Sequence, residues 1–199
     1  TDGEGGEEKT NALPVRKVSK LPGVKGMCLL FVASVGIEVT AGSWGATFLV
    51  ESKGVTEDRA AWYVMFYYIG MAVGRFLSGV LAAKLHSWQI IRLGMIVLGV
   101  ALVVLLLPVP PVWSAVGLFL VGLGNGPMFP NYNYLAPESF GPEVSQSVIG
   151  TQMAFSYIGV MLVPTVFGVL GQVVTVALFP AYLTAFFLVM VVFTVKVRQ

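Results

Sequence analysis

The chain has 199 residues, of which 56% are hydrophobic and only 11% are charged. Soluble domains carry roughly 25% charged residues, so the composition excludes a water-soluble globule and predicts an integral membrane protein. The formal net charge of +2 says little by itself. A single cysteine, Cys28, excludes an internal disulfide, and with only one histidine, His86, no metal site is expected.

The chain divides into an arm and a bundle. Residues 1–26 are polar, glycine-rich and charged without helical periodicity, which predicts a flexible cytosolic arm. Six apolar stretches follow, each close to the ~20 residues that a helix needs to cross a bilayer. They cover residues 27–50, 60–83, 90–108, 112–135, 146–170 and 178–195. We therefore predict an all-α integral membrane fold with six transmembrane helices over residues 27–199.

Lysine and arginine concentrate on one side of these spans, nine against two, with Arg75 inside a span. The nine are Lys9, Arg16, Lys17, Lys20, Lys25, Lys84, Arg92, Lys196 and Arg198. Because these residues favour cytoplasmic loops, we expect both termini on the cytoplasmic side of the cell (inner) membrane. Basic residues without interleaved aromatic residues fit this rule better than they fit nucleic-acid binding.

The second and fifth spans match when the sequence is shifted by 89 residues, with YIGMAVGRFLSGVL lying over YIGVMLVPTVFGVL. That shift is the length of three spans, an odd number, so the two copies must be inverted. We predict repeats over about 27–110 and 112–197, an arrangement typical of secondary transporters. In this alignment Arg75 lies opposite Pro164 and Glu38 lies opposite Pro127, so the second copy carries helix breaks where the first carries charge.

The sequence resembles the C-terminal six-helix half of a major facilitator superfamily transporter of the fucose-permease-like bacterial branch. The resemblance rests on YYIGMAVGRFLSGVLAAKL, GLGNGPMFPNYNYLAPESFG and SVIGTQMAFSYIGVMLVPTVFGVLG. The loop GVLAAKLHSW departs from the superfamily pattern G-x-L-A-D-R-x-G-R-K, since Ala83 replaces the acid and His86 and Ser87 replace Gly and Arg. The resemblance implies that the first and fourth spans line a solute cavity and that the second and fifth form gates.

Glu38 lies near the middle of the first span, where a charge is costly and usually marks a solute or ion pathway or a buried pair. It is our candidate for proton coupling, and a structural hydrogen bond or ion pair is the alternative. Arg75 follows a ladder of small residues, Gly70, Gly74 and Ser78, that favours close helix packing. Arg75 either pairs with Glu38, binds an anionic solute or extends to the headgroups; the resemblance favours a gate or ion-pair role.

The fourth span combines asparagines with prolines in GNGPMFPNYN. Proline removes backbone hydrogen bonds, and freed backbone groups at membrane depth are tolerated only inside protein or at a cavity. We expect helix breaks at Pro127, Pro130 and Pro164, and either a broken, cavity-lining helix or a kink that only shapes packing. The candidate cavity residues are Trp44, Asn125, Asn131 and Gln152, whose amides and aromatic ring suit a sugar; Trp44 is equally suited to anchor at the membrane interface.

Together these features predict half of a proton-coupled secondary transporter that moves a small polar solute, a sugar for example, by alternating access. Six helices cannot enclose a route, so a second six-helix bundle is implied: a missing N-terminal half or a parallel homodimer. The alternative is a non-transporting membrane domain that acts in folding or interaction. No phosphate-binding glycine loop or activated nucleophile indicates an enzyme, and no cofactor is expected beyond the proton gradient as driving force.

Overall fold

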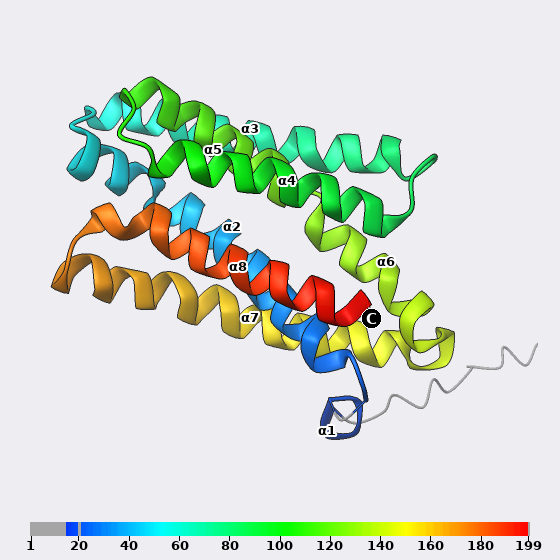
Figure 1. The fold of residues 1–199 in the computed structure, drawn as a ribbon. Coiled ribbons are helices and arrows are strands. Elements are labelled where there is room, and N and C mark those ends of the chain that lie inside the picture. Colours follow the sequence, from blue (N-terminus) through cyan, green and yellow to red (C-terminus); the bar gives the residue numbers. More distant parts are fainter. Residues whose placement is uncertain (1–14, 20, 199) are drawn as a thin grey trace, which may run out of the picture.

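The computed structural model describes residues 15–19 and 21–198, and all regular structure within them is helical. The helices are α1 (Val15–Val18), α2 (Val24–Lys53), α3 (Glu57–Leu81), α4 (Ser87–Leu106), α5 (Pro111–Asn125), α6 (Met128–Phe140), α7 (Pro142–Val173), the 3₁₀ helix η1 (Val176–Leu178) and α8 (Phe179–Arg198). They form an elongated bundle in which α1 lies at the end that carries the C-terminus (Figure 1). We call this the termini end, and the opposite end the far end.

The prediction of six spans is confirmed. Six helical stretches of the described chain are long and apolar enough to cross a membrane, and α5 and α6 together make the fourth. Large apolar side chains on the outside of the bundle, such as Phe76 (71% exposed) and Ile96 (63% exposed), fit a lipid environment rather than water.

The first span begins at Val24, three residues before the predicted boundary of the arm. Gly23 adopts a φ of 87°, which suits glycine, and connects α1 to α2. Val18 of α1 packs with Val24, Cys28 and residues of α6 and α7 at the termini end. The rest of the predicted flexible arm, residues 1–14 and 20, lies outside the described residues.

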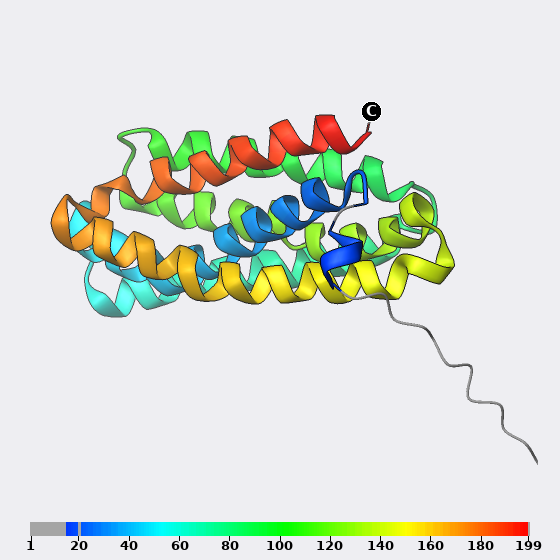
Figure 2. The ribbon, with the colours of Figure 1, turned by 90° about the horizontal axis from the view of Figure 1, so that it is seen from below.

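The helix packing shows two inverted repeats, α2–α4 and α5–α8. In the first repeat, α3 and α4 pack along α5; in the second, α7 and α8 pack along α2 (Figures 1 and 2). Burial follows the repeat, since residues 68–70 and 157–159 both consist of two exposed residues followed by a buried glycine. The main helix contacts of the first repeat therefore have counterparts in the second: α3 and α4 against α5 correspond to α7 and α8 against α2.

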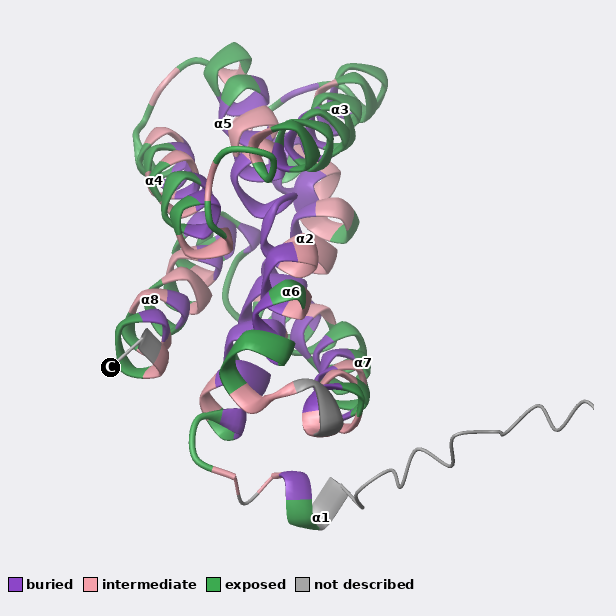
Figure 3. Ribbon diagram, turned by 90° about the vertical axis from the view of Figure 1, so that its right-hand side faces the viewer, coloured by how far each residue is buried: buried purple, intermediate pink, exposed green. Residues whose placement is uncertain are grey.

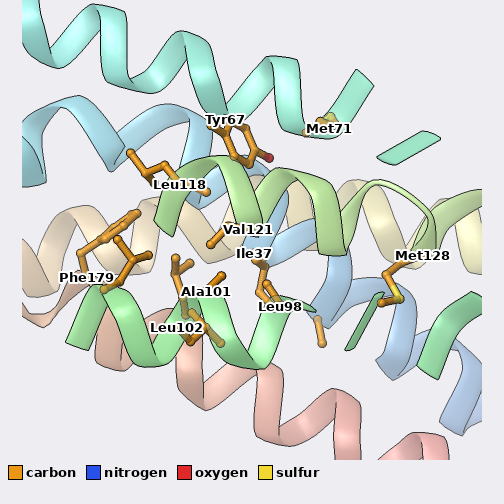
Figure 4. Close-up of a cluster of buried hydrophobic side chains, with 14 of the residues drawn as sticks. Ile37, Tyr67, Met71, Leu98, Ala101, Leu102, Leu118, Val121, Met128 and Phe179 are labelled. Atoms are coloured by element: carbon orange, nitrogen blue, oxygen red, sulfur yellow. The ribbon is translucent and has the colours of Figure 1, made fainter. Parts of the chain in front are cut away.

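The helices at the centre of the bundle are α2 and the α5–α6 pair, which are the most buried spans (Figure 3). Their core side chains meet α3, α4 and η1–α8 in one apolar cluster that includes Ile37, Tyr67, Leu98, Leu118 and Phe179 (Figure 4). This core fixes the positions of α2, α3 and α5–α6 along the bundle axis. Those helices carry most of the predicted site residues.

The fourth span is interrupted at one of the positions where a break was expected. α5 ends at Asn125, and α6 starts at Met128 after Gly126 and Pro127, which both keep right-handed helical dihedrals. The break is therefore a kink rather than a loop. Pro130 lies in the first turn of α6, where its missing N–H costs little.

Pro164 does not break its helix, contrary to expectation. α7 runs continuously from Pro142 to Val173 with Pro164 inside it. Neighbouring helices supply hydrogen-bond donors beside the proline: Trp44 Nε1 donates to the Pro164 carbonyl at 3.0 Å, and the Tyr182 hydroxyl donates to the Val163 carbonyl at 2.7 Å. These bonds join α7 to α2 and α8 at the level of the proline.

Glycines bring the backbones of α3 and α5 into direct contact. A Cβ atom built on Gly70 would clash with the carbonyl oxygen of Phe119, and one on Gly122 would clash with the carbonyl oxygen of Tyr67. The predicted small-residue ladder on α3 is therefore a packing surface, matched by glycines on α5. Small residues of this kind are how helices associate in a membrane, where burial from water supplies no driving force between them.

We predict that Gly70→Ala strongly lowers the thermal stability of the native protein in detergent. The clash is with backbone, so no rotamer change relieves it, and overpacking of this kind costs roughly 1–3 kcal/mol or more. Gly79→Ala on the same helix is the matched control, because a Cβ there meets nothing within 4 Å. Equal melting temperatures for the two variants would contradict the glycine contact.

Candidate functional site

Glu38 and Arg75 form an ion pair between α2 and α3. Nη2 of Arg75 donates to Oε1 of Glu38 at 2.9 Å, and the two side chains are 49% (Arg75) and 25% (Glu38) exposed. Within the described chain, the other close contact of a carboxylate with a basic side chain joins His86, in the α3–α4 turn, to Glu138 of α6. The Glu38–Arg75 pair is therefore the one that links two spans within their length. Of the alternatives for Arg75, the structure shows the pair with Glu38.

The pair lies on the wall of a cavity of about 670 Å³ between α2, α3, α6 and α7. Its lining residues are Val35, Glu38, Val39, Arg75, Ser78, Gly79, Ala82, Phe129, Pro130, Tyr134, Met153, Ser156, Tyr157 and Val160. Of the predicted site residues, Glu38, Arg75 and Pro130 line this cavity. Both charged groups therefore face an open space on one side of the bundle, not the apolar core.

A buried tyrosine fixes α3 against α2 at the level of the ion pair. The Tyr67 side chain is fully buried, and its hydroxyl donates to the backbone carbonyl of Glu38 at 2.9 Å. Tyr67 was missed at the sequence level because the only signal is its position, two turns before Arg75 on α3. This bond fixes the position of Glu38 along α3 and keeps its carboxylate within reach of the Arg75 guanidinium.

The two asparagines are buried and bonded to protein instead of facing the cavity. Asn125 accepts from the Ser34 hydroxyl and donates to the Ser34 carbonyl, both at 3.0 Å, which joins α5 to α2. Asn131 donates through Nδ2 to the Ser78 hydroxyl and to the Pro127 carbonyl, both at 2.7 Å. They hold the kinked fourth span in place, while Phe129, Pro130 and Tyr134 of the same span line the cavity.

Gln152 is fully buried in α7, and neither atom of its side-chain amide has a hydrogen-bond partner. The next residue, Met153, lines the cavity, but Gln152 does not. A buried unpaired amide costs about 1–3 kcal/mol, so this conformation leaves Gln152 in an unfavourable environment.

Trp44 lines a second cavity, of about 590 Å³, toward the far end. Its lining residues are Ser43, Trp44, Thr47, Pro164, Thr165, Gly168, Val169 and Gln172. The indole N–H of Trp44 is bonded to Pro164, and the ring packs edge-on against Phe167 at 5.5 Å. The structure thus separates the predicted residues into a charged cavity near the middle of the bundle and an uncharged cavity beyond it.

The loop that departs from the superfamily pattern makes a contact of its own. His86 caps α4 by accepting from the Trp88 N–H through Nδ1 at 3.3 Å, and its Nε2 lies 3.1 Å from Oε2 of Glu138 on α6. The histidine therefore connects the α3–α4 turn to the kinked fourth span. The described residues contain no group of three or more His, Cys, Asp or Glu side chains that could hold a metal ion.

We predict that Asn125→Ala destabilises the protein by about 1–2 kcal/mol, the upper range for interhelical hydrogen bonds in membranes. In a double-mutant cycle, Ser34→Ala should cost much less in the Asn125→Ala background than in the native protein. Ser114→Ala is the matched control, because Ser114 is fully buried on α5 and its hydroxyl has no partner. Equal unfolding free energies for all three single variants would contradict this assignment.

Two relatives show what the sequence is similar to. Bypass of stop codon protein 6 of Saccharomyces cerevisiae is 25% identical over 186 residues, which are 87% of this chain and 37% of that protein. The glucose/galactose transporter of Brucella abortus biovar 1 is 27% identical over 151 residues, 72% of this chain and 35% of that protein. The chain therefore spans little more than a third of the length of these relatives.

The fold is similar to that of solved transporters. A crystal structure of the E. coli fucose:proton symporter FucP superimposes with a TM-score of 0.79 at 15% identity, covering 93% of this chain and 45% of that chain. A second FucP structure, in the outward conformation, gives a TM-score of 0.78. The predicted resemblance to a six-helix half of a fucose-permease-like transporter is confirmed at the level of the fold. The family model of the Major Facilitator Superfamily matches residues 8–199 of the sequence, so the chain belongs to this superfamily.

Proposed function

We propose that this chain forms one half of a secondary active transporter that moves a small polar solute, a sugar by its chemistry, across the membrane. The observation that carries the proposal is the cavity of about 670 Å³ with the Glu38–Arg75 pair on its wall, in a bundle with the fold of a transporter half. One relative is named a glucose/galactose transporter, and a structural neighbour is a fucose:proton symporter.

The second wall of the cavity comes from another six-helix bundle. The cavity is lined by α2, α3, α6 and α7 on one side of this bundle only, and the chain covers less than half of each FucP chain. The second bundle is either an N-terminal half or a parallel copy of this chain. Rocking of the two bundles about the shared cavity gives alternating access. Following the lysine and arginine distribution, the termini end faces the cytoplasm in an inner membrane.

The chemistry of the cavity wall suits a neutral polyhydroxylated solute. Ser78, Ser156, Tyr134 and Tyr157 bring hydroxyl groups to it, and Phe129 brings an aromatic face. Trp44 remains a candidate solute contact through the uncharged second cavity, whose walls carry hydroxyl and amide groups. Asn125 and Asn131 act indirectly, by holding the kinked span that shapes the cavity.

Gln152 is a candidate solute contact in a second conformation. Its amide is buried without a partner beside the cavity-lining Met153. A small rotation of α7 that brings this amide to the cavity would relieve the cost of leaving it unpaired.

Glu38 carries the coupled proton in this proposal. Protonation removes the negative charge of Glu38 and leaves the Arg75 guanidinium without its partner inside the membrane, where an unpaired charge is costly. The protonated state therefore favours a conformation in which Arg75 reaches another acceptor, in the solute or in the second bundle. A proton that interacts differently with two conformations shifts the equilibrium between them.

We predict that Glu38→Gln lowers proton-driven sugar uptake by at least about tenfold, because glutamine can neither bind nor release the proton that shifts the equilibrium. Uptake of labelled glucose, galactose and fucose is measured in proteoliposomes of the native protein under a pH gradient, and exchange without a gradient should persist. Glu138→Gln is the matched control, since Glu138 is half exposed and pairs with His86 outside the cavity. Undiminished gradient-driven uptake by the Glu38 variant would refute the coupling role.

A further inference from the structure

We propose that Tyr68 and Tyr157, which occupy matching positions in the two repeats, are solute contacts on opposite sides of the Glu38–Arg75 pair. Tyr68 contacts the solute toward the far end, and Tyr157 contacts it toward the termini end. The inference rests on the proposed transport function and names residues that set affinity for a sugar ring. Neither tyrosine belongs to the candidate set that the sequence provides.

Both tyrosines lie on the cavity side of their helices. Tyr157 lines the 670 Å³ cavity and is 72% exposed. Tyr68 is 53% exposed, and it precedes the cavity-lining residues Arg75, Gly79 and Ala82 by seven, eleven and fourteen positions. At 3.6 residues per turn those spacings place all four residues on one face of α3.

Along the bundle axis, the two side chains lie on opposite sides of the ion pair. A Cβ atom built on Gly42 would lie 2.7 Å from the Tyr68 hydroxyl, and Gly42 is four residues beyond Glu38 on α2, about 6 Å toward the far end. On α7, Tyr157 precedes Gly159, which packs against Val32. Val32 is six residues before Glu38, so Tyr157 lies about 9–12 Å toward the termini end.

The hydroxyls of both tyrosines are available to a ligand. The described chain offers neither of them a hydrogen-bond partner, whereas the neighbouring Tyr67 hydroxyl is bonded to Glu38. A hydroxyl without a partner is unfavourable in hydrocarbon, so these positions suit a hydrated or solute-filled cavity. A tyrosine also offers a flat apolar face to the C–H groups of a sugar ring, as well as a donor and acceptor for its hydroxyls.

Tyr68 is held in place by the same residues that hold the ion pair. Its ring meets the buried Tyr67 ring edge-on at a centroid distance of 5.0 Å, and Tyr67 is bonded to the Glu38 carbonyl. A solute that displaces Tyr68 therefore acts on Tyr67, the residue that fixes the position of Glu38 along α3. Because the repeats are inverted, one repeat position supplies a contact on each side of the pair, and alternating access exposes the two contacts in turn.

The test uses Tyr68→Ala, Tyr68→Phe, Tyr157→Ala and Tyr157→Phe in the native protein, reconstituted in one orientation. The half-saturation concentration for labelled galactose is measured from each side of the membrane. Tyr68→Ala should raise it at least about tenfold at the far-end side, and Tyr157→Ala should do so at the termini side, which corresponds to about 1.4 kcal/mol. The phenylalanine variants keep the ring and guard against misfolding, and they should show smaller shifts on the same sides.

Phe66→Ala and Phe155→Ala are the matched controls, because these residues also correspond in the repeats and are exposed (42% and 37%). Each lies two positions before its tyrosine, about 200° around the helix, and so on another face. Tyrosine variants that behave like these controls on both sides would overturn the proposal. Equal shifts on the two sides for each variant would also overturn it, because the proposal assigns each tyrosine to one side of the ion pair. If the native protein itself transports no sugar, the proposed function fails, which is a separate outcome.

Discussion

Close backbone contact between α3 and α5 is the constraint on which the rest of this bundle depends. Gly70 and Gly74 of α3, Gly122 of α5 and Gly126 just after α5 leave no space for a Cβ atom at the crossing. Within lipid, helices gain little from apolar burial against one another, so such close approach is a main source of attraction. The same contact sets the position of the site, since Arg75 follows Gly74 directly and its amide nitrogen lies 3.3 Å from a Cβ built on Gly126. The guanidinium is thereby held beside the kink of the fourth span and opposite Glu38.

Polar side chains in the bundle fall into two groups with different roles. Ser34 with Asn125, and Ser78 with Asn131, connect neighbouring helices through hydrogen bonds. The groups left for a solute are the ion pair and hydroxyls on the cavity wall. α3 is tied to α2 and α6 by hydrogen bonds of Tyr67, Arg75 and Ser78. The bonds that tie α7 to α2 and α8 lie at Pro164 and Val163, outside this cavity.

Much of this fold follows from the sequence, and the shortfalls have physical causes. Span length and apolar composition were sufficient to predict the six helices, and the depths of Glu38 and Arg75 within their spans made a pair possible. The α7 wall of the cavity, with Ser156 and Tyr157, was not predicted, because a helix that is apolar all round has no periodicity to show which face meets a cavity. Residue type was also insufficient for Asn125, since an amide suits a sugar and a neighbouring helix equally well. Pro164 shows the same limit, because a proline by itself does not determine whether a membrane helix is interrupted, and α7 continues through it.

The internal repeat explains why one ion pair is enough for the proposed coupling. Where the first repeat has Glu38 and Arg75, the second has Pro127 and Pro164. A second carboxylate–guanidinium pair at the matching positions would bring two more charges into the membrane, each with its own desolvation cost. Prolines at those positions weaken the backbone ladder of the second repeat instead, through the kink between α5 and α6 and the lost amide donor in α7. The chain thus confines the titratable chemistry to one repeat and places the deformable helix positions in the other, and the two meet at the cavity, where Pro130 lies on the same wall as Glu38 and Arg75. A change in the charge of Glu38 therefore takes place in the cavity that the kinked fourth span also lines.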